Sequence, residues 1–300
     1  MRGKAGLRNS PAVDSRNDDY PLTMSSLQPL LPDTELTIYC LKGDLSGVNI
    51  AAEGFLGTWQ DGGYAFLFFR GSSNFSIRRF LECHAQYQLE QRFAMTYGEW
   101  QGGFADPVRI GRFLLNPPWL KRVPADGEIA LSFDPGLVFG NGTHPTTLAC
   151  LTAVEIACAG GKIERMIDLG TGTGLLALAA AKLDCSQVVA IDNNLLAART
   201  AENNRKLNQL ESVLVVCGCA EAFASLPSDL LVANIGHRVL ADILTPGNLR
   251  HQRWLVLSGL QNREAESILG MLARLDVLVL KRWLSDNIWN TILAITKDGR

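Results

Sequence analysis

The feature that most constrains the fold is a glycine-rich loop between an apolar strand and an apolar helix. The loop reads Asp168-Leu-Gly170-Thr-Gly172-Thr-Gly174, and the helix predicted after it covers 175–183. Glycine adopts the left-handed backbone conformations that a tight turn against a ligand requires. A second strand, predicted over 187–192, ends in Asp192. This order of strand, glycine loop, helix, strand and carboxylate predicts a nucleoside pocket in which Asp192 accepts hydrogen bonds from ribose hydroxyls.

The position of the third glycine indicates which cofactor binds. A dinucleotide fingerprint, G-x-G-x-x-G, would need glycine where this chain has Leu175, so that the helix could approach a diphosphate closely. The pattern D-x-G-x-G-x-G is instead typical of methyltransferases that use S-adenosylmethionine. We therefore predict S-adenosylmethionine as the cofactor, with Gly170, Gly172, Gly174 and Asp192 in contact with it. A glycine turn that only packs a helix on a strand is the alternative, and a nicotinamide oxidoreductase is disfavoured.

Composition narrows the class of protein. A chain of 300 residues, 47% hydrophobic and 19% charged, can bury two unequal cores. Seven cysteines without a repeated spacing favour a reduced, cytoplasmic protein, and the scattered histidines give no metal site beside Cys217-Gly-Cys219. A net charge of −2 argues against binding nucleic acid through phosphates. No apolar run is long enough for a signal peptide or a membrane span, so we expect a soluble protein.

Turn-forming residues and the periodicity of hydrophobic residues divide the chain into four predicted parts. Residues 1–33 are predicted to be a disordered extension, within which Met24 is a possible start. Residues 34–98 are predicted to form a small ferredoxin-like α+β domain and residues 99–127 a linker rich in Gly and Pro. In the small domain we expect strands over 36–41, 54–59, 64–70 and 89–97, a helix over 75–84, and a first helix reduced to 44–51.

Residues 128–300 are predicted to form a doubly wound α/β sheet of the Rossmann-like kind, because strands and helices alternate from Arg165 onward. The last two strands form an antiparallel hairpin on the sheet edge, over 277–283 and 289–296. Between these and the glycine loop we expect strands over 213–217, 229–235 and 254–260, and helices over 195–207, 239–244 and 264–275.

A second polar constellation precedes the glycine loop. It runs from Phe133 to Thr147 and ends in Thr143-His-Pro-Thr-Thr147. Pro145 suits the first turn of a helix, with Thr143 as its cap, so Thr147 would lie near free backbone donors that can bind a carboxylate. A segment that merely caps the helix is the alternative.

With these segments the chain resembles a known family, the bacterial methyltransferases of large-subunit ribosomal protein L11. The similarity rests on Pro107-Val-Arg-Ile-Gly-Arg112, Pro118-Trp119, the 133–147 run, Asp168–Gly174, Asp192, Ala233-Asn-Ile235 and Leu257-Ser-Gly259. It covers Trp100 to the C-terminus well and the small domain only in outline. The resemblance implies a class I methyltransferase domain and a small domain that recognises the ribosomal protein. It also implies cofactor contacts at Thr147, Gly170, Asp192 and Asn234.

The activity that the resemblance implies is S-adenosylmethionine-dependent methylation of lysine and N-terminal amines of ribosomal protein L11. Asn234 ends an apolar strand where an open sheet presents ligands, so we expect it to orient the amine and act in catalysis. The sequence departs from the family at Gly236-His-Arg238, where His237 is either a base or a helix-start residue facing solvent. A methyltransferase of another protein or a small amine, and a non-catalytic module that binds S-adenosylmethionine, remain open.

Overall fold

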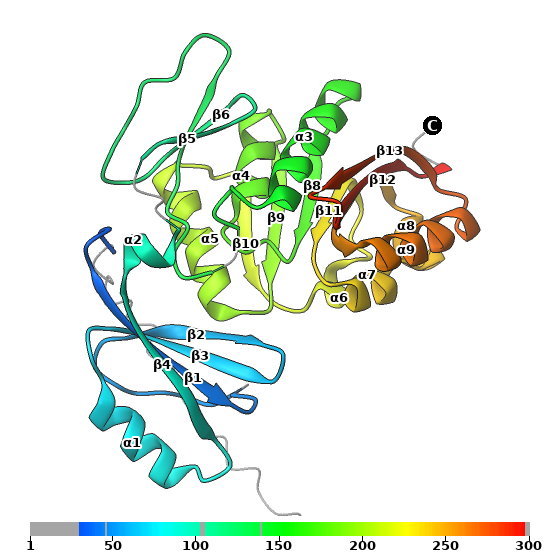
Figure 1. Ribbon diagram of the computed structural model, residues 1–300. Helices are drawn as coiled ribbons and strands as arrows, with labels where there is room; N and C mark the ends of the chain where they lie inside the picture. The colour runs from blue at the N-terminus through cyan, green and yellow to red at the C-terminus, as the bar shows by residue number, and fades with distance from the viewer. Residues whose placement is uncertain (1–29, 46, 103–105, 139, 298–300) are drawn as a thin grey trace, which may run out of the picture.

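The computed structural model describes residues 30–45, 47–102, 106–138 and 140–297, which form a small and a large domain (Figure 1). The predicted disordered extension over 1–33 lies almost wholly outside the described residues, as does Phe139. Within the described part of the chain, no helix is long and apolar enough to cross a membrane.

The small domain is one antiparallel sheet with a helix on one face. Its elements are β1 (Glu35–Lys42), β2 (Phe55–Asp61), β3 (Tyr64–Arg70), α1 (Asn74–Cys83) and β4 (Gln88–Thr96). The strand order is β2-β3-β1-β4 with every neighbouring pair antiparallel, which is the order of a ferredoxin-like sheet. Gly62 and Gly63, both with positive φ, close the β2–β3 hairpin.

The helix expected over 44–51 is wrong. The described residues of this stretch are not helical, and Leu45, Val48 and Ile50 pack with the core under β1 and β3 as a loop. Gly47 has a φ of 76°, and Val48 and Ile50 are β-branched, so the segment has little intrinsic helix propensity. The spacing of apolar residues in this stretch reflects burial of their side chains, and it does not by itself indicate a helix.

The large domain is a seven-stranded sheet between two layers of helices. Its order is β10-β9-β8-β11-β12-β14-β13, parallel except that β14 is antiparallel to both of its neighbours, so the predicted C-terminal hairpin is confirmed. The elements are α3 (Pro145–Gly160), β8 (Arg165–Leu169), α4 (Leu175–Lys182), β9 (Gln187–Asp192), α5 (Leu195–Leu207), β10 (Val213–Cys217), α6 (Ala220–Phe223), β11 (Ser228–Asn234), α7 (His237–Ile243), α8 (Pro246–Leu249), β12 (Gln252–Gln261), α9 (Asn262–Arg274), β13 (Leu278–Ser285) and β14 (Trp289–Ile295).

The topology sets where a ligand can bind. The central strands are apolar on both faces, as Leu230-Leu-Val-Ala233 of β11 shows, because helices cover the sheet on both sides. From β8 the chain builds outward to β9 and β10, and then returns to place β11 and β12 on the other side. The order therefore reverses between β8 and β11. Open α/β sheets bind ligands at such a point, outside the carboxyl ends of the strands.

The predicted linker over 99–127 is wrong as a description of structure. It contains most of a third sheet, formed by β5 (Val108–Ile110), β6 (Phe113–Asn116) and β7 (Ile129–Ser132), which follows α2 (Tyr97–Trp100). Phe113 and Leu115 are fully buried in the core that α3 and α4 also form. Strands this short among Gly and Pro leave little hydrophobic period, which is why the sequence indicated a loop.

The two domains share a packed interface, with α2 between them in Figure 1. Leu36, Ile38 and Phe68 of the small sheet bury a common apolar cluster with Tyr97 and Leu137. Tyr97 donates from its hydroxyl to the buried Asp134 carboxylate, and Gln101 Nε2 donates to the Gly136 carbonyl. These bonds hold α2 against the segment over 134–145, which we call the strap.

Candidate active site at the switch point of the large sheet

The glycine loop between β8 and α4 has the backbone that its sequence predicts. Gly170, Gly172 and Gly174 have φ of 72°, 56° and 83°, in the left-handed region that favours glycine. The amides of Gly170 and Thr171 donate to the Ile191 carbonyl of β9 at 2.8 and 2.9 Å. A Cβ on Gly170 would collide with Cγ2 of Ile235. The loop is therefore held against β9 and β11 and tolerates no side chain at Gly170.

Asp192 stands at the carboxyl end of β9, beside this loop. Its Oδ2 accepts from the Gly172 amide at 2.9 Å, and its Oδ1 accepts from the Asn194 amide at 2.9 Å. Burial raises the pKa of this carboxyl, while the two backbone bonds oppose the change. A carboxylate has about four acceptor positions, so Asp192 retains capacity for hydroxyl donors of a ligand.

Asp168 is a second carboxyl at the site, to which the sequence assigned no role of its own. It is 1% exposed, and Thr171 Oγ1 donates to its Oδ2 at 2.6 Å. Burial raises the pKa of Asp168 to about 7, and the neighbouring charge of Asp192 contributes to this rise. Near neutral pH this group therefore changes its charge beside the glycine loop.

The start of α3 differs from the prediction in its cap. His144, and not Thr143, is the N-cap residue, because its Nδ1 accepts from the Thr146 amide at 3.3 Å. Thr143 donates instead to Asn141 Oδ1 through its amide and its hydroxyl. Pro145 occupies the first turn, as predicted. A histidine ring nitrogen can cap as a hydroxyl does, but cap preferences from sequence favour Thr.

Thr147 lies one residue further into the first turn of α3. The residue is 3% exposed, and its Oγ1 is buried without a hydrogen-bond partner among the described residues. A buried hydroxyl without a partner costs free energy, so Thr147 Oγ1 is available to hydrogen-bond a bound ligand.

Asn234 ends β11 directly across the switch point from the glycine loop. Its Nδ2 donates to Thr146 Oγ1 at 3.3 Å, which joins the end of β11 to the start of α3. Gly259 shapes the other side of this amide: a Cβ there would lie 3.2 Å from Asn234 Oδ1 and 2.8 Å from the Ile235 carbonyl oxygen. Gly259 has a φ of 81° and lies where the β12–β14 register shifts. In the sequence, the only indication that Gly259 belongs to the site was the similarity of Leu257-Ser-Gly259 to the family.

His237 begins α7, as expected of a helix-start residue, but its ring does not simply face solvent. Its Nε2 is buried and has no hydrogen-bond partner among the described residues. The residue is partly exposed, so one ring nitrogen is buried while the rest of His237 still reaches the surface. Whether His237 acts as a base stays a prediction.

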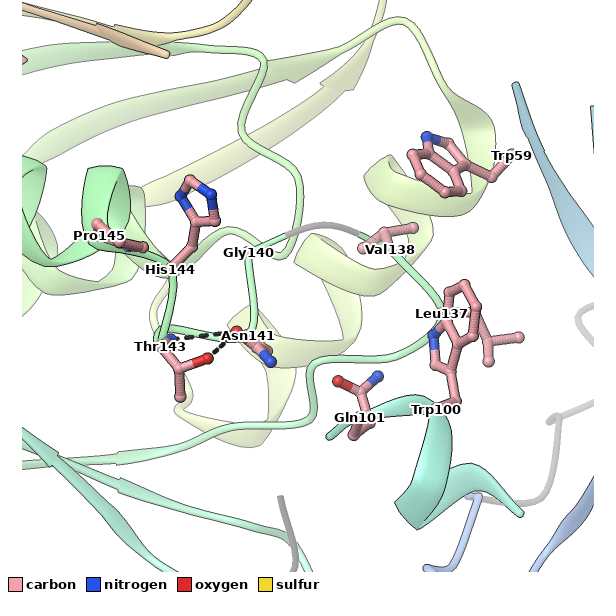
Figure 2. Close-up of a pocket in the computed structure, with 10 residues that line it drawn as sticks. All are labelled: Trp59, Trp100, Gln101, Leu137, Val138, Gly140, Asn141, Thr143, His144 and Pro145. Atoms are coloured by element: carbon pink, nitrogen blue, oxygen red, sulfur yellow. Dashed lines mark hydrogen bonds between the residues drawn. The ribbon is translucent and has the colours of Figure 1, made fainter. Parts of the chain in front are cut away.

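A cavity of about 450 Å³ lies between the strap and the small domain (Figure 2). The glycine loop does not line this cavity. The loop contacts the cavity wall through Thr173, whose Oγ1 donates to the Gly140 carbonyl at 2.9 Å. The residues that line it are Trp59, Trp100, Gln101, Leu137, Val138, Gly140, Asn141, Thr143, His144 and Pro145. Over the residues that the structure describes, no group of three or more His, Cys, Asp or Glu could hold a metal ion.

Comparison with known proteins agrees with the resemblance seen in the sequence. The family model described as ribosomal protein L11 methyltransferase (PrmA) matches residues 91–297. The ribosomal protein L11 methyltransferase of Lacticaseibacillus paracasei is 43% identical over 142 residues, covering 47% of this chain and 43% of that protein. The protein of the same name from Desulforamulus reducens is 34% identical over 193 residues, covering 63% of this chain and 62% of that protein.

A solved structure of a protein with the same family name also matches this chain. The ribosomal protein L11 methylase of Lactobacillus delbrueckii subsp. bulgaricus superposes with a TM-score of 0.57 at 26% identity, covering 64% of this chain and 98% of that one. The chain spans about half the length of the curated relatives that it matches. Because the family model matches most of the chain, this protein belongs to the ribosomal protein L11 methyltransferase family, whose class I methyltransferases use S-adenosylmethionine.

Proposed function

We propose that this chain is a protein methyltransferase that transfers methyl groups from S-adenosylmethionine to lysine and N-terminal amines of ribosomal protein L11. The observation that carries the proposal is the convergence of the glycine loop, Asp192 and Asn234 at the carboxyl ends of β8, β9 and β11. The name shared by the family model and the relatives supports the protein substrate. A ribosomal-protein substrate would place the reaction in the cytoplasm, as the cysteine content predicts.

The residues of the site fit this cofactor. The left-handed glycines admit a ligand close to the backbone, Asp192 would accept from the ribose hydroxyls, and the orphan Thr147 hydroxyl would gain a partner. When bound, S-adenosylmethionine supplies a methyl group on a sulfonium sulfur, which a neutral amine can accept by in-line displacement. Asn234 would orient that amine, and burial of the site would favour its uncharged form.

Two other functions are distinguishable by experiment. A methyltransferase of another protein or small amine is favoured by the Gly236-His-Arg238 departure beside Asn234 and would leave L11 unmodified. A non-catalytic module would bind S-adenosylmethionine without turnover. Mass spectrometry of L11 after incubation with the purified chain and S-adenosylmethionine tests all three. Added masses that correspond to whole methyl groups are expected on L11.

Asp192→Ala is expected to weaken S-adenosylmethionine binding by about 1.5–3 kcal/mol, the range for hydrogen bonds to a charged group. Calorimetric titration measures it. Asp229→Ala is a matched control, since that carboxylate also accepts from two backbone amides, those of Glu164 and Arg165, but at the amino-terminal ends of β8 and β11. Equal affinities of the wild type and Asp192→Ala would remove Asp192 from the cofactor site.

Cofactor affinity is expected to rise as pH increases toward about 7 and to level off above it. The pKa of Asp168 is about 7 without ligand, and a sulfonium bound beside the loop would lower it. Binding then releases a proton, so affinity increases as pH rises toward the ligand-free pKa, by up to about tenfold for each unit by which the pKa falls. Titration in buffers of different ionisation enthalpy measures the protons released. Asp168→Asn should flatten the dependence, and S-adenosylhomocysteine, whose thioether sulfur is uncharged, should show less of it. An unchanged slope in Asp168→Asn would contradict the assignment.

A further inference from the structure

The cavity between the domains has an aromatic wall that the cofactor site does not explain. Trp59 of β2 and Trp100 of α2 stand on one side of it, and Thr143, His144 and Pro145 stand on the other (Figure 2). Both indoles are half-buried. Trp59 stacks on Phe66 with ring centroids 5.4 Å apart, and Trp100 meets Phe68 edge-on at 5.0 Å. Neighbouring strand β3 therefore holds both indoles in place, so the wall is built into the fold.

The opposite wall is part of the catalytic region. Gly140 is hydrogen-bonded to Thr173 of the glycine loop, and His144 caps the helix whose Thr146 accepts from Asn234. A group in the cavity thus lies against Gly140, which contacts the glycine loop, and against His144, which caps the turn that holds Thr146, the partner of Asn234. The small domain contributes Trp59 and α2 contributes Trp100, so both take part in the wall of this cavity.

The charge of the lining is as informative as its shape. None of the ten lining residues carries a carboxylate or a Lys or Arg side chain. Burial lowers the pKa of His144, and Asp286 only partly opposes this, so the imidazole adds no positive charge at neutral pH. A cation here would meet two indole rings and no carboxylate among the lining residues. Tryptophan attracts ammonium groups through its ring quadrupole, and a methylated ammonium, which loses donors but keeps its charge, suits such a site.

We propose that this cavity binds the alkylammonium end of a lysine or N-terminal amine, and that Trp59 and Trp100 bind its charge by cation–π contact. The inference rests on the proposed function, because the cavity would hold the protonated end of the acceptor beside the site, and the amine would reach Asn234 once it has lost its proton. A carboxylate would stabilise the protonated amine, which cannot accept a methyl group. Indoles bind the cation without accepting its proton, so the amine can still deprotonate to water. Because they need no N–H donor, they also retain mono- and dimethylated amines for further transfer.

The test uses the full-length protein, saturated with S-adenosylhomocysteine, and two probes of equal shape. One is Nε-trimethyl-lysine, and the other is its uncharged analogue with a tert-butyl group in place of trimethylammonium. Indole resonances in nuclear magnetic resonance spectra report binding. The charged probe is expected to bind about threefold to thirtyfold more tightly, as cation–π contacts imply. Equal affinities would overturn the proposal whatever the chain's activity proves to be.

Variants then test whether Trp59 and Trp100 are the residues that bind the charge. Trp59→Leu and Trp100→Leu should remove the preference for the charged probe, whereas Trp59→Phe and Trp100→Phe should keep part of it. Trp283→Leu on β13 is the control and should keep all of it. Calorimetry of S-adenosylmethionine binding verifies that each variant is folded. A preference that survives in both leucine variants would overturn the role of the indoles.

Methylation products separate this inference from the proposed function. With L11 as substrate, the leucine variants should accumulate monomethyl amines where the wild type proceeds to higher states, read by mass spectrometry. If the wild type methylates nothing, the proposed function fails, while the two probes still decide whether the cavity binds ammonium. An unchanged distribution of methylation states in the leucine variants of an active enzyme would contradict the part of the proposal that concerns repeated transfer.

Discussion

Asn234→Ala is expected to lower the turnover number about a hundredfold while S-adenosylmethionine affinity changes by less than about tenfold. The amide of Asn234 lies at the end of β11, fixed between Thr146 Oγ1 and the backbone turn at Gly259. A group held in this way can align an amine with the methyl group. A misplacement of a reacting group by about 1 Å lowers the rate about a hundredfold. Its loss should therefore be felt mainly in the transition state.

Single-turnover methylation and calorimetric titration measure the two quantities separately. Asn248→Ala on α8 is the control, since its side-chain amide donates to the nearby Ile243 carbonyl, while the bond to the Thr245 hydroxyl is made by its backbone amide and is kept. Gly259→Ala approaches the same amide from the other side, because its Cβ would press on Asn234 Oδ1, and it should reduce turnover without removing the amide. Equal losses of turnover and cofactor affinity in Asn234→Ala would give Asn234 a cofactor-only role.

The parts of this fold that could be predicted are those in which local pattern and global packing agree. Strand β9 and helix α5 have the predicted bounds, because their apolar period continues until a turn residue ends it. The glycine loop could be predicted for a different reason. Its backbone needs left-handed residues at three positions, and only glycine supplies them without strain, so the sequence records the geometry directly.

The errors occur where long-range contacts decide the structure. Phe113 and Leu115 belong to strands too short to show a period, and the large-domain core is what makes them strands. The Thr143 cap was wrong because Asn141 engages that hydroxyl, a competition between side chains that cap preference does not express. The cavity was not predicted at all. Trp59, Trp100 and Leu137 meet only because β2, α2 and the strap pack together.

Removing the small domain is expected to abolish methylation of L11 at low substrate concentration, and two truncated chains can show how much of the site it builds. A chain that begins at Thr96 keeps α2, and with it the Tyr97–Asp134 and Gln101–Gly136 bonds. A chain that begins at Asp106 loses both. Without Tyr97, the carboxyl of Asp134, whose pKa burial already raises, loses its hydroxyl partner. The Gly136 amide still donates to this carboxyl at 3.1 Å, but loss of a hydrogen bond to a buried carboxyl costs about 1–3 kcal/mol.

The shorter chain should therefore unfold at a lower denaturant concentration than the longer one, while both expose Leu137 and Leu196 that the small sheet covers. Both should bind S-adenosylmethionine if they fold, because β8, β9 and β11 with their loops are complete in each. Neither should methylate L11 at low concentration, since the docking that raises its effective concentration is gone. Tyr97→Phe in the full chain isolates the hydroxyl. Methylation of L11 at the full rate by either truncated chain would refute substrate recruitment by the small domain, and equal stabilities of the two would show that Tyr97 does not stabilise the strap.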